Sequence, residues 1–286
     1  MTIKTWALLG LLVMLACAKP ASAAQSYDNC TGFITSLPAV ISTQGTWCLK
    51  QDLSTAVTTG NAITINTNNV TIDCNDFKLG GLSAGAGTQT IGIHALNRLN
   101  ATVRRCNIRG FYVGLLFAGT GGGHAIEDNR LDGNTSSGIV VQGDGSVVRR
   151  NRVFDTGGST LGGDGTGIYA DKSVDVIDNT VSGATGAAST NGWGIGITAN
   201  NDFDGSIVGN RVRGLVPGGT GTTFGLIATS SNRLEVRDNA FVGDGSVNSA
   251  GVKCDAANGN VHNNTINLFE TAIVNCNDDG GNIVHP

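Results

Sequence analysis

The stretch CDAANGNVHNNTI, residues 254–266, ends with a unit that returns throughout the chain. In this unit one apolar residue stands three positions before an asparagine, and another stands two positions after it. Eight instances follow one another at intervals of 22 to 31 residues, and such internal self-similarity is the sequence signature of a repeat architecture. The central positions are Asn75, Cys106, Asn129, Asn151, Asn179, Asn210, Asn239 and Asn264.

The recurring asparagine predicts a corner. Asparagine tolerates left-handed backbone angles better than other non-glycine residues, so it can occupy a sharp bend between two short strands. Its side-chain amide both donates and accepts hydrogen bonds, so equivalent amides in successive coils can bond to one another. We therefore expect an asparagine ladder, with Cys106 at one position and the following members: Asn75, Asn129, Asn151, Asn179, Asn210, Asn239 and Asn264.

A second motif, a small residue followed by alternating apolar residues, fills the other half of each unit, as in GIVV, GIYA and GITA. Alternation with a period of two predicts a strand, and no helical periodicity competes with it after about residue 60. Short parallel strands at regular intervals predict an all-β parallel β-helix, a solenoid of about eight coils. The expected inward positions are Ile93, Leu115, Ile139, Ile168, Ile197, Leu226, Val252 and Val274.

The two motifs together resemble the right-handed parallel β-helix superfamily, the fold of pectate lyases, polygalacturonases and alginate epimerases. The resemblance covers about residues 40–286 and implies a groove over one sheet, where catalysis and sugar binding occur in that superfamily. The segment LPAVISTQGTWCLKQDLS, residues 37–54, resembles the cap that closes the first coil. We expect a cap and first strands over residues 24–60 and the β-helix over residues 61–286.

The start of the chain is typical of an exported protein. The run from Trp6 to Ala18 is apolar but too short to span a membrane, and small residues follow at 21–23. We predict a signal peptide over residues 1–23, a secreted or periplasmic location and no membrane span, with lipid anchoring at Cys17 as the alternative. Without this segment 16 basic and 22 acidic residues remain, so we expect no nucleic-acid partner.

Six cysteines follow the predicted cleavage site, an even number consistent with disulfides in an oxidising compartment. One pair aligns in successive coils, where strands about 4.8 Å apart fit the geometry of a disulfide, and a second pair is offset by one position. We predict no cysteine or histidine metal centre, because the chain has no Cys-x-x-Cys or His-x-His spacing. The predicted pairs are Cys254–Cys276, Cys74–Cys106 and Cys30–Cys48.

Insertions concentrate on one side of the repeat. From the ladder position to the glycine that opens the next alternating strand, the interval rises to 16, 17 and 15 residues in three consecutive coils. Insertions on one face commonly build the binding face of a solenoid. We expect a groove walled by DTGGSTLGGDGTG (155–167), SGATGAASTNGWG (182–194) and RGLVPGGTGTTFG (213–225).

Three carboxylates beside these loops are candidate catalytic residues: Asp171, Asp202 and Asp164. Asp171 and Asp202 fall in adjacent coils and could form an acid–base pair, or hold a calcium ion together with Asn200. The alternative is that all three are solvated turn residues, since aspartate in GDGT stabilises turns.

Tyr169, Trp193 and Asn200 are candidate substrate-binding residues of the same groove. Trp193, flanked by glycines, could stack on a sugar ring or pack on the apolar atoms of its own loop.

Ten of the twelve arginines cluster at the asparagine corner. Arg130, Arg152 and Arg211 directly follow ladder positions and are further candidates for substrate binding, because the guanidinium group suits bidentate capture of carboxylates. A polyuronide could lie along this column. Interleaved acids such as Asp128 and Asp132 offer the alternative of ion pairs between coils.

Two functions therefore stay open. The first is an exported enzyme acting on an acidic polysaccharide as a lyase, hydrolase or epimerase, with Ca²⁺ as a possible cofactor. The second is a non-catalytic β-helix that binds glycans or serves as a structural surface protein. The chain lacks the catalytic sets of polygalacturonases and the compact aspartate cluster of calcium-dependent pectate lyases, so the resemblance transfers no catalytic residue.

Overall fold

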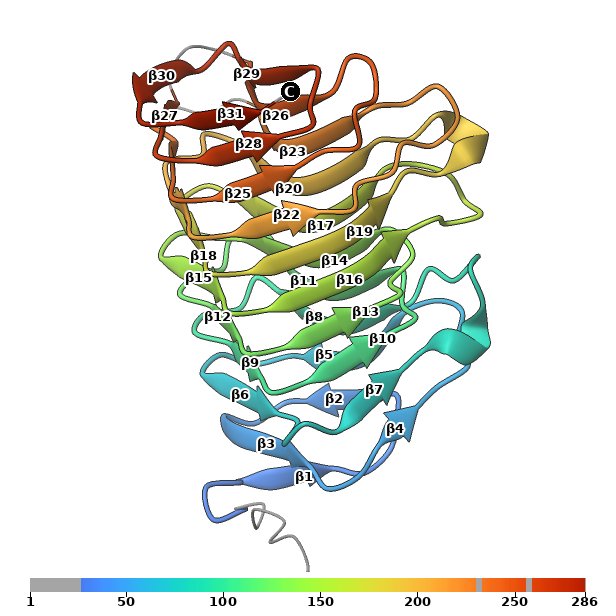
Figure 1. Cartoon of the computed structure of the whole chain (residues 1–286). Coiled ribbons are helices and arrows are strands. Elements are labelled where there is room, and N and C mark those ends of the chain that lie inside the picture. Colours follow the sequence, from blue (N-terminus) through green and yellow to red (C-terminus); the bar gives the residue numbers. More distant parts are fainter. Residues whose placement is uncertain (1–26, 230–232, 256–258, 286) are drawn as a thin grey trace, which may run out of the picture.

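The computed structural model describes residues 27–229, 233–255 and 259–285, which form a three-sided solenoid of parallel strands (Figure 1). The predicted signal peptide and Cys17 lie outside the described residues. Each coil contributes one strand to sheet B, then one to sheet A and one to sheet C.

Sheet A has eleven strands in coil order. They are β1 (Gly32–Ile34), β3 (Gly45–Leu49), β6 (Val70–Asp73), β9 (Thr102–Arg104), β12 (Ala125–Glu127), β15 (Ser146–Arg149), β18 (Val174–Ile177), β21 (Ser206–Val208), β24 (Glu235–Arg237), β27 (Asn260–His262) and β30 (Asn277–Gly280).

Sheet B has ten strands and carries the alternating motif. They are β2 (Ala39–Ile41), β5 (Asn61–Ile65), β8 (Ile91–Leu96), β11 (Val113–Ala118), β14 (Ser137–Gln142), β17 (Gly165–Asp171), β20 (Gly194–Asn200), β23 (Thr223–Ala228), β26 (Ala250–Cys254) and β29 (Thr271–Val274).

Sheet C has ten strands and faces the viewer in Figure 1. They are β4 (Leu53–Ser54), β7 (Lys78–Gly80), β10 (Asn107–Arg109), β13 (Arg130–Asp132), β16 (Arg152–Gly157), β19 (Thr180–Thr185), β22 (Arg211–Arg213), β25 (Ala240–Val242), β28 (Thr265–Asn267) and β31 (Ile283–His285).

Helical structure is confined to two short 3₁₀ helices in loops, η1 (Leu82–Ala84) and η2 (Ala188–Thr190), within the described residues. No helix in this part of the chain is long and apolar enough to cross a membrane. The predicted all-β parallel β-helix is confirmed. The estimate of about eight coils is slightly low, because coils at the two ends, where the repeat is irregular, add strands to every sheet.

The first complete coil is regular. Its strands β2, β3 and β4 pair in parallel with β5, β6 and β7 of the next coil. A capping role for residues 24–60 stays a prediction.

The core is a stack of apolar columns inside the solenoid. Seven of the eight predicted inward residues of sheet B are completely buried, from Ile93 to Val252. The eighth prediction was wrong: Val252 pairs with Ile273, so Val274 faces outward beside Lys253. The short motif AIV does not fix which apolar residue points inward, and the register of the sheet decides it.

The asparagine ladder is confirmed from Asn129 onward. The side-chain amide nitrogen of each asparagine donates to the Oδ1 atom of the next at 3.0 Å, through Asn151, Asn179, Asn210, Asn239 and Asn264. Asn282, which the repeat did not reveal, extends the ladder with the same 3.0 Å contact from Asn264. Each Oδ1 also accepts the backbone N–H of the preceding ladder residue, so the buried amides are bonded on both sides.

From Asn129 onward the left-handed bend does not fall on the ladder asparagine, as the sequence had suggested, but on the residue before it, whereas Asn75, with φ of 48°, is itself left-handed as expected. Asp128, Arg150, Asp178, Asp238 and Asn263 have φ between 55° and 59°. The bend residue points outward, whereas the asparagine points inward, where its amide reaches the next coil. Asparagine is therefore selected here for its side-chain hydrogen bonds rather than for its backbone.

The first corner differs from the others, and two predictions for it were wrong. The segment between Asn75 and strand β7 is two residues longer than at the other corners. The inward residue that pairs with Ile108 is therefore Leu79, and not Phe77 as the repeat predicted. Asn75 does not bond to a ladder amide above it, because Cys106 occupies that position; its amide donates to the Leu49 carbonyl at 3.3 Å.

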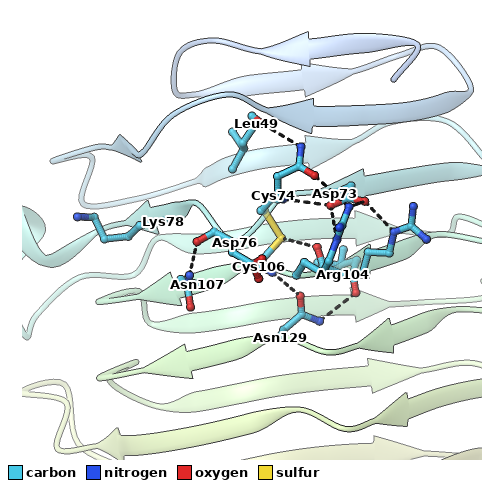
Figure 2. Close-up of a disulfide and its surroundings, with 12 residues drawn as sticks. Leu49, Asp73, Cys74, Asp76, Lys78, Arg104, Cys106, Asn107 and Asn129 are labelled. Carbon is cyan, nitrogen blue, oxygen red and sulfur yellow. Dashed lines mark hydrogen bonds and ion pairs between the residues drawn. A yellow bond between two sulfur atoms is a disulfide. The ribbon is translucent and has the colours of Figure 1, made fainter. Parts of the chain in front are cut away.

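A disulfide links this corner to the ladder (Figure 2). Cys74 and Cys106 lie 4.7 Å apart at Cα, and the backbone N–H of Cys106 donates to Asn129 Oδ1 at 3.0 Å. A covalent bond thus takes the place of the amide pair between these two coils.

All three predicted disulfides are confirmed, and they lie toward the ends of the solenoid. Cys254 and Cys276 were expected at equivalent positions, but the register places Cys254 opposite Asn275. The left-handed Asn275, with φ of 57°, turns the chain so that Cys276 still approaches to 5.2 Å at Cα.

A column of glycines runs through sheet B beside the inward residues. A Cβ atom at any of its members would lie 2.4 to 2.7 Å from a backbone oxygen of the next coil. These distances are below ordinary van der Waals contact, so the small residue of the motif is required by the packing of the coils. The members are Gly92, Gly114, Gly138, Gly167, Gly196, Gly225 and Gly251.

We expect Gly167→Ala to lower the free energy of unfolding by about 1–3 kcal/mol, because the new methyl group would lie 2.4 Å from Val181 and 2.7 Å from the Gly196 oxygen. Gly80→Ala is the matched control, since a Cβ there would meet its nearest neighbour at 3.6 Å. Urea unfolding of both variants measures the difference. Equal stability of the two variants would contradict the packing argument.

Candidate functional site

The long loops all lie at the corner between sheets C and B, on the right of Figure 1. Loops 158–164, 186–193 and 214–222 stack on one another as the coils do. The backbone N–H of Gly163 donates to Thr190 Oγ1 at 2.7 Å, and that of Thr220 donates to Asn191 Oδ1 at 3.0 Å. The three predicted insertions therefore form one continuous wall.

A fourth long loop, residues 81–90, follows β7 at the same corner. The interval from Asn75 to Gly92 spans 17 residues and would have revealed it. Its Ala86 carbonyl accepts a hydrogen bond from the N–H of Thr160 at 3.3 Å, across the two intervening coils with short corners.

Asp164 and Trp193 connect two of the loops. Asp164 Oδ1 accepts the backbone N–H of Trp193 at 2.7 Å. The indole ring is 37% exposed and packs edge-on against Phe224, with 5.2 Å between ring centroids. Asp164 thus holds adjacent loops together, while Trp193 presents part of its ring to solvent at the edge of sheet B.

The outer face of sheet B beside Trp193 is apolar. Ile195, Phe224, Ile227 and Ala250 form a second hydrophobic cluster, separate from the core, and each of them is buried, with 2% to 6% exposure. They come from three neighbouring strands, because Ile195 pairs with Phe224 and Phe224 pairs with Ala250. Strict alternation would place Phe224 on the same side as the inward Leu226, so the sequence motif did not reveal its place in this cluster.

A pocket of about 320 Å³ opens next to this cluster. Phe224, Ala250 and Val274 form its apolar side. The Lys253 ammonium group lies 5.2 Å from the Phe224 ring centroid and, with Glu270, provides the charged groups at its border. The remaining lining residues are Asn248, Ser249 and Thr271, which are polar and uncharged.

Asp171, at the end of β17, belongs to a polar network rather than to an open groove. It is only 1% exposed, and its Oδ2 atom accepts hydrogen bonds from Gln142 and Asn201, both at 2.7 Å. Its Oδ1 atom is buried without a hydrogen-bond partner among the described residues. Burial raises the pKa of this carboxyl group, although the two amide donors oppose the shift.

Tyr169 and Asn200 extend the network across the sheet. The Asn200 amide donates to the Tyr169 hydroxyl at 2.5 Å, and Asn200 Oδ1 accepts a hydrogen bond from Thr229. Burial raises the pKa of the half-buried Tyr169, and the nearby Asp171 carboxylate adds to the shift. The structure therefore brings together three of the candidate residues, Tyr169, Asn200 and Asp171, and their roles in binding or catalysis stay predictions.

Asp202 does not join Asp171. It is exposed, in a left-handed turn with φ of 58°, and the adjacent Asn201 contacts Asp171 in its place. Within residues 27–229, 233–255 and 259–285, no group of three or more acidic, histidine or cysteine side chains is arranged to hold a metal ion.

The three candidate arginines lie on another face. Arg130, Arg152 and Arg211 are on strands β13, β16 and β22 of sheet C and share one outward column through Thr180. The predicted substrate-binding residues thus divide into two separate surfaces, one over sheet B and one over sheet C.

The sequence profile of the family described as "right handed beta helix region" matches residues 51–204, more than half of the chain. The chain belongs to the right-handed β-helix family. No curated protein matches it.

Solved structures similar to this β-helix include the Dettilon tailspike protein, with 15% identity and a TM-score of 0.47, over 88% of this chain and 60% of that one. A variant tailspike of E. coli bacteriophage HK620 in complex with a pentasaccharide shows 11% identity and a TM-score of 0.44, over 84% and 60% of the two chains. The A-module of a mannuronan C-5 epimerase from Azotobacter vinelandii shows 13% identity and a TM-score of 0.35, over 84% and 81%. This β-helix spans about three fifths of the two tailspike chains, and the likeness concerns the fold alone.

The buried Asp171 predicts a pH-dependent stability. Because its pKa is raised in the folded protein, the folded state binds more protons than the unfolded state between the two pKa values. The free energy of unfolding therefore falls as the pH rises above about 4, the ordinary pKa of aspartate. Asp171→Asn removes this titration and keeps an acceptor for Gln142 and Asn201, so its stability relative to the wild type should increase with pH.

Urea unfolding between about pH 4 and pH 8 checks this prediction. Asp171→Ala should be about 1–3 kcal/mol less stable than Asp171→Asn at every pH, because it leaves the amides of Gln142 and Asn201 without their acceptor. Asp202→Asn, which replaces the exposed carboxylate, is the control. An Asp171→Asn variant whose relative stability decreases with pH would refute the assignment.

Proposed function

We propose that this β-helix is an exported polysaccharide-binding protein that holds a glycan along the outer face of sheet B. One observation supports this most directly: a partly exposed Trp193 stands over the outward Phe224 and its apolar cluster, next to a pocket. Ligand sites in proteins commonly combine such an apolar surface with a few polar groups that fix orientation.

The chemistry of this face suits a sugar better than a strongly charged ligand. Aromatic side chains offer large flat surfaces to the C–H faces of sugar rings, and Trp193 is positioned for this contact. Asn248, Ser249, Thr271 and Glu270 offer donors and acceptors for sugar hydroxyl groups. The stacked loops provide a wall along which an extended chain could lie.

Export forms part of the proposal. Three disulfides are typical of proteins that fold in an oxidising compartment, and the predicted signal peptide accounts for how the chain reaches it. A secreted or periplasmic location follows from these two arguments together.

Processing of the bound glycan is the second candidate, and the buried Asp171 favours it. Its raised pKa and unpartnered Oδ1 atom, on the strand that carries Tyr169, are features of acid–base residues. At 1% exposure this carboxyl group would have to be uncovered by movement of Gln142 or Asn201 before it could reach a sugar. Lyase, hydrolase and epimerase chemistry, with or without Ca²⁺, would each need Asp171 to be uncovered and to transfer a proton. Asp171→Asn should therefore abolish any release of unsaturated uronides or reducing ends.

Trp193→Ala should weaken glycan binding at least tenfold, about 1.4 kcal/mol, because truncation of a tryptophan at a contact removes most of its stacking surface. Titration calorimetry with a panel of neutral and acidic oligosaccharides first identifies the ligand and then compares the variants. Trp193→Phe should restore part of the affinity. Val247→Ala, at a 73% exposed position in loop 243–249, is the matched control and should bind like the wild type.

Binding without turnover, lost in Trp193→Ala, would support the binding function alone. An affinity that Trp193→Ala leaves unchanged would exclude this face as the site.

A further inference from the structure

The outer face of sheet C has a charge opposite to that of the whole chain. The chain carries a formal net charge of −4. The outward positions of strands β7 to β22 nevertheless hold six cationic residues and only two acids, Asp132 and Asp155. The cationic residues are Lys78, Arg109, Arg130, Arg152, Arg211 and Arg213.

Most arginines at the neighbouring corner are neutralised by acids. Arg105 contacts Asp73, Arg150 contacts Asp128 through two hydrogen bonds of 2.8 Å, and Arg237 contacts Glu235 at 2.9 Å. For Arg105 and Arg150 the alternative raised by the sequence, ion pairs between coils, is confirmed, whereas Arg237 pairs with acids of its own coil. Their charges are therefore compensated within the protein.

Four arginines on sheet C lack such compensation. Arg109, Arg152, Arg211 and Arg213 have no acidic partner within 4 Å among the described residues, and the last three of them are exposed. Arg130 differs, because it pairs with Asp132 at 3.2 Å and lies over the Phe154 ring at 4.6 Å. The uncompensated positive charge is thus concentrated between β16 and β22.

The register of the sheet orders these groups in space. Arg152 pairs with Thr180, and Thr180 pairs with Arg211. Since neighbouring strands lie about 4.8 Å apart, two guanidinium-bearing rows stand about 10 Å apart on either side of a row with the hydroxyl groups of Thr180 and Ser182. We define Arg152, Thr180, Ser182, Arg211 and Arg213 as the cationic face.

A shallow pocket extends the cationic face along the solenoid axis. It has a volume of about 310 Å³, and Arg152, Arg130 and Asn107 line it together with two acids, Asp76 and Asp128. A second pocket of about 270 Å³ follows and shares Asn107 and Arg130 with the first, but three acids, Asp52, Asp76 and Asp132, offset its cations. Figure 2 shows Asn107 and Lys78 at the far end of this series, beside the Cys74–Cys106 disulfide. Binding groups therefore follow one another from coil to coil along one line.

We propose that the cationic face binds a linear acidic polysaccharide, whose carboxylate groups run along the solenoid axis. Guanidinium groups hold carboxylates with two parallel hydrogen bonds, and the intervening hydroxyl groups can donate to the same chain. Single-stranded nucleic acid fits less well, because such sites rely on exposed aromatic rings for stacking, and Arg130 covers Phe154. This surface is independent of the proposed sugar site on sheet B.

The proposal is tested with polygalacturonate as the probe and its fully methyl-esterified form as the uncharged control. The wild-type protein should bind polygalacturonate, and its affinity should fall at least tenfold between about 50 mM and 500 mM NaCl, since charge attraction carries the binding. The triple variant Arg152→Gln, Arg211→Gln, Arg213→Gln should lose at least tenfold in affinity at low salt. The matched control, Arg149→Gln with Arg237→Gln, removes arginines that are paired with Glu127 and Glu235 and should stay within about twofold.

Three results would overturn the proposal: no binding of polygalacturonate by the wild type, equal binding of the esterified polymer, or an unchanged affinity in the triple variant. The protein could instead bind vesicles of anionic lipid more strongly than the polymer and lose that binding in the triple arginine variant. This result would assign the cationic face to a membrane surface. Trp193→Ala should keep its affinity for polygalacturonate at low salt. A failure of the sheet C proposal can therefore be distinguished from a failure of the sheet B proposal.

Discussion

The buried amides at the corner between sheets A and C find most of their hydrogen-bond partners in the neighbouring coils. From Asn129 to Asn264, each side chain accepts from the coil before it and donates to the coil after it. An unpaired buried amide would cost about 1–3 kcal/mol, so any slip of one coil against the next is penalised at this corner. The glycine column imposes the same register on sheet B, because only a hydrogen atom fits under the next backbone oxygen. The ladder and the glycines together hold successive coils in one alignment.

That alignment determines where the molecule can vary. The A–C corner has no room for additional residues once the amides are stacked, except at the first corner, where the Cys74–Cys106 disulfide replaces an amide pair. Insertions are instead accepted at the C–B corner, where loops 158–164, 186–193 and 214–222 bond to each other outside the core. The candidate sugar site follows from this asymmetry, because Trp193 reaches the outer face of sheet B only from such a loop.

The sequence predicted features that repeat with the coils, and it failed where a contact depends on a single coil. Inward positions and ladder asparagines recur once in each coil, and the cysteines of two disulfides fall at nearly equivalent positions of successive coils, so alignment of the repeats reveals them. Val274 was placed on the wrong side because its strand lacks the opening glycine that sets the register elsewhere. The neighbour of Asp171 was expected to be Asp202 but is Asn201, because a left-handed turn reverses which of two adjacent side chains points back toward the sheet. Pairing among the arginines could not be inferred either, because the acids that pair with Arg150 lie 22 and 23 residues earlier in the sequence.

The same stacking makes each face of the solenoid a surface with its own chemistry. Every outward position is one member of a column, and one substitution per coil changes a column without disturbing the core behind it. Along sheet B the columns are largely apolar and uncharged between β8 and β23, whereas along sheet C they carry six cationic side chains. Because the core and the loops of the C–B corner separate these two faces, a ligand on one of them makes no direct contact with the other. A rigid β-helix of this kind can therefore hold an extended polymer on either face in the same direction, along the axis on which its own coils repeat.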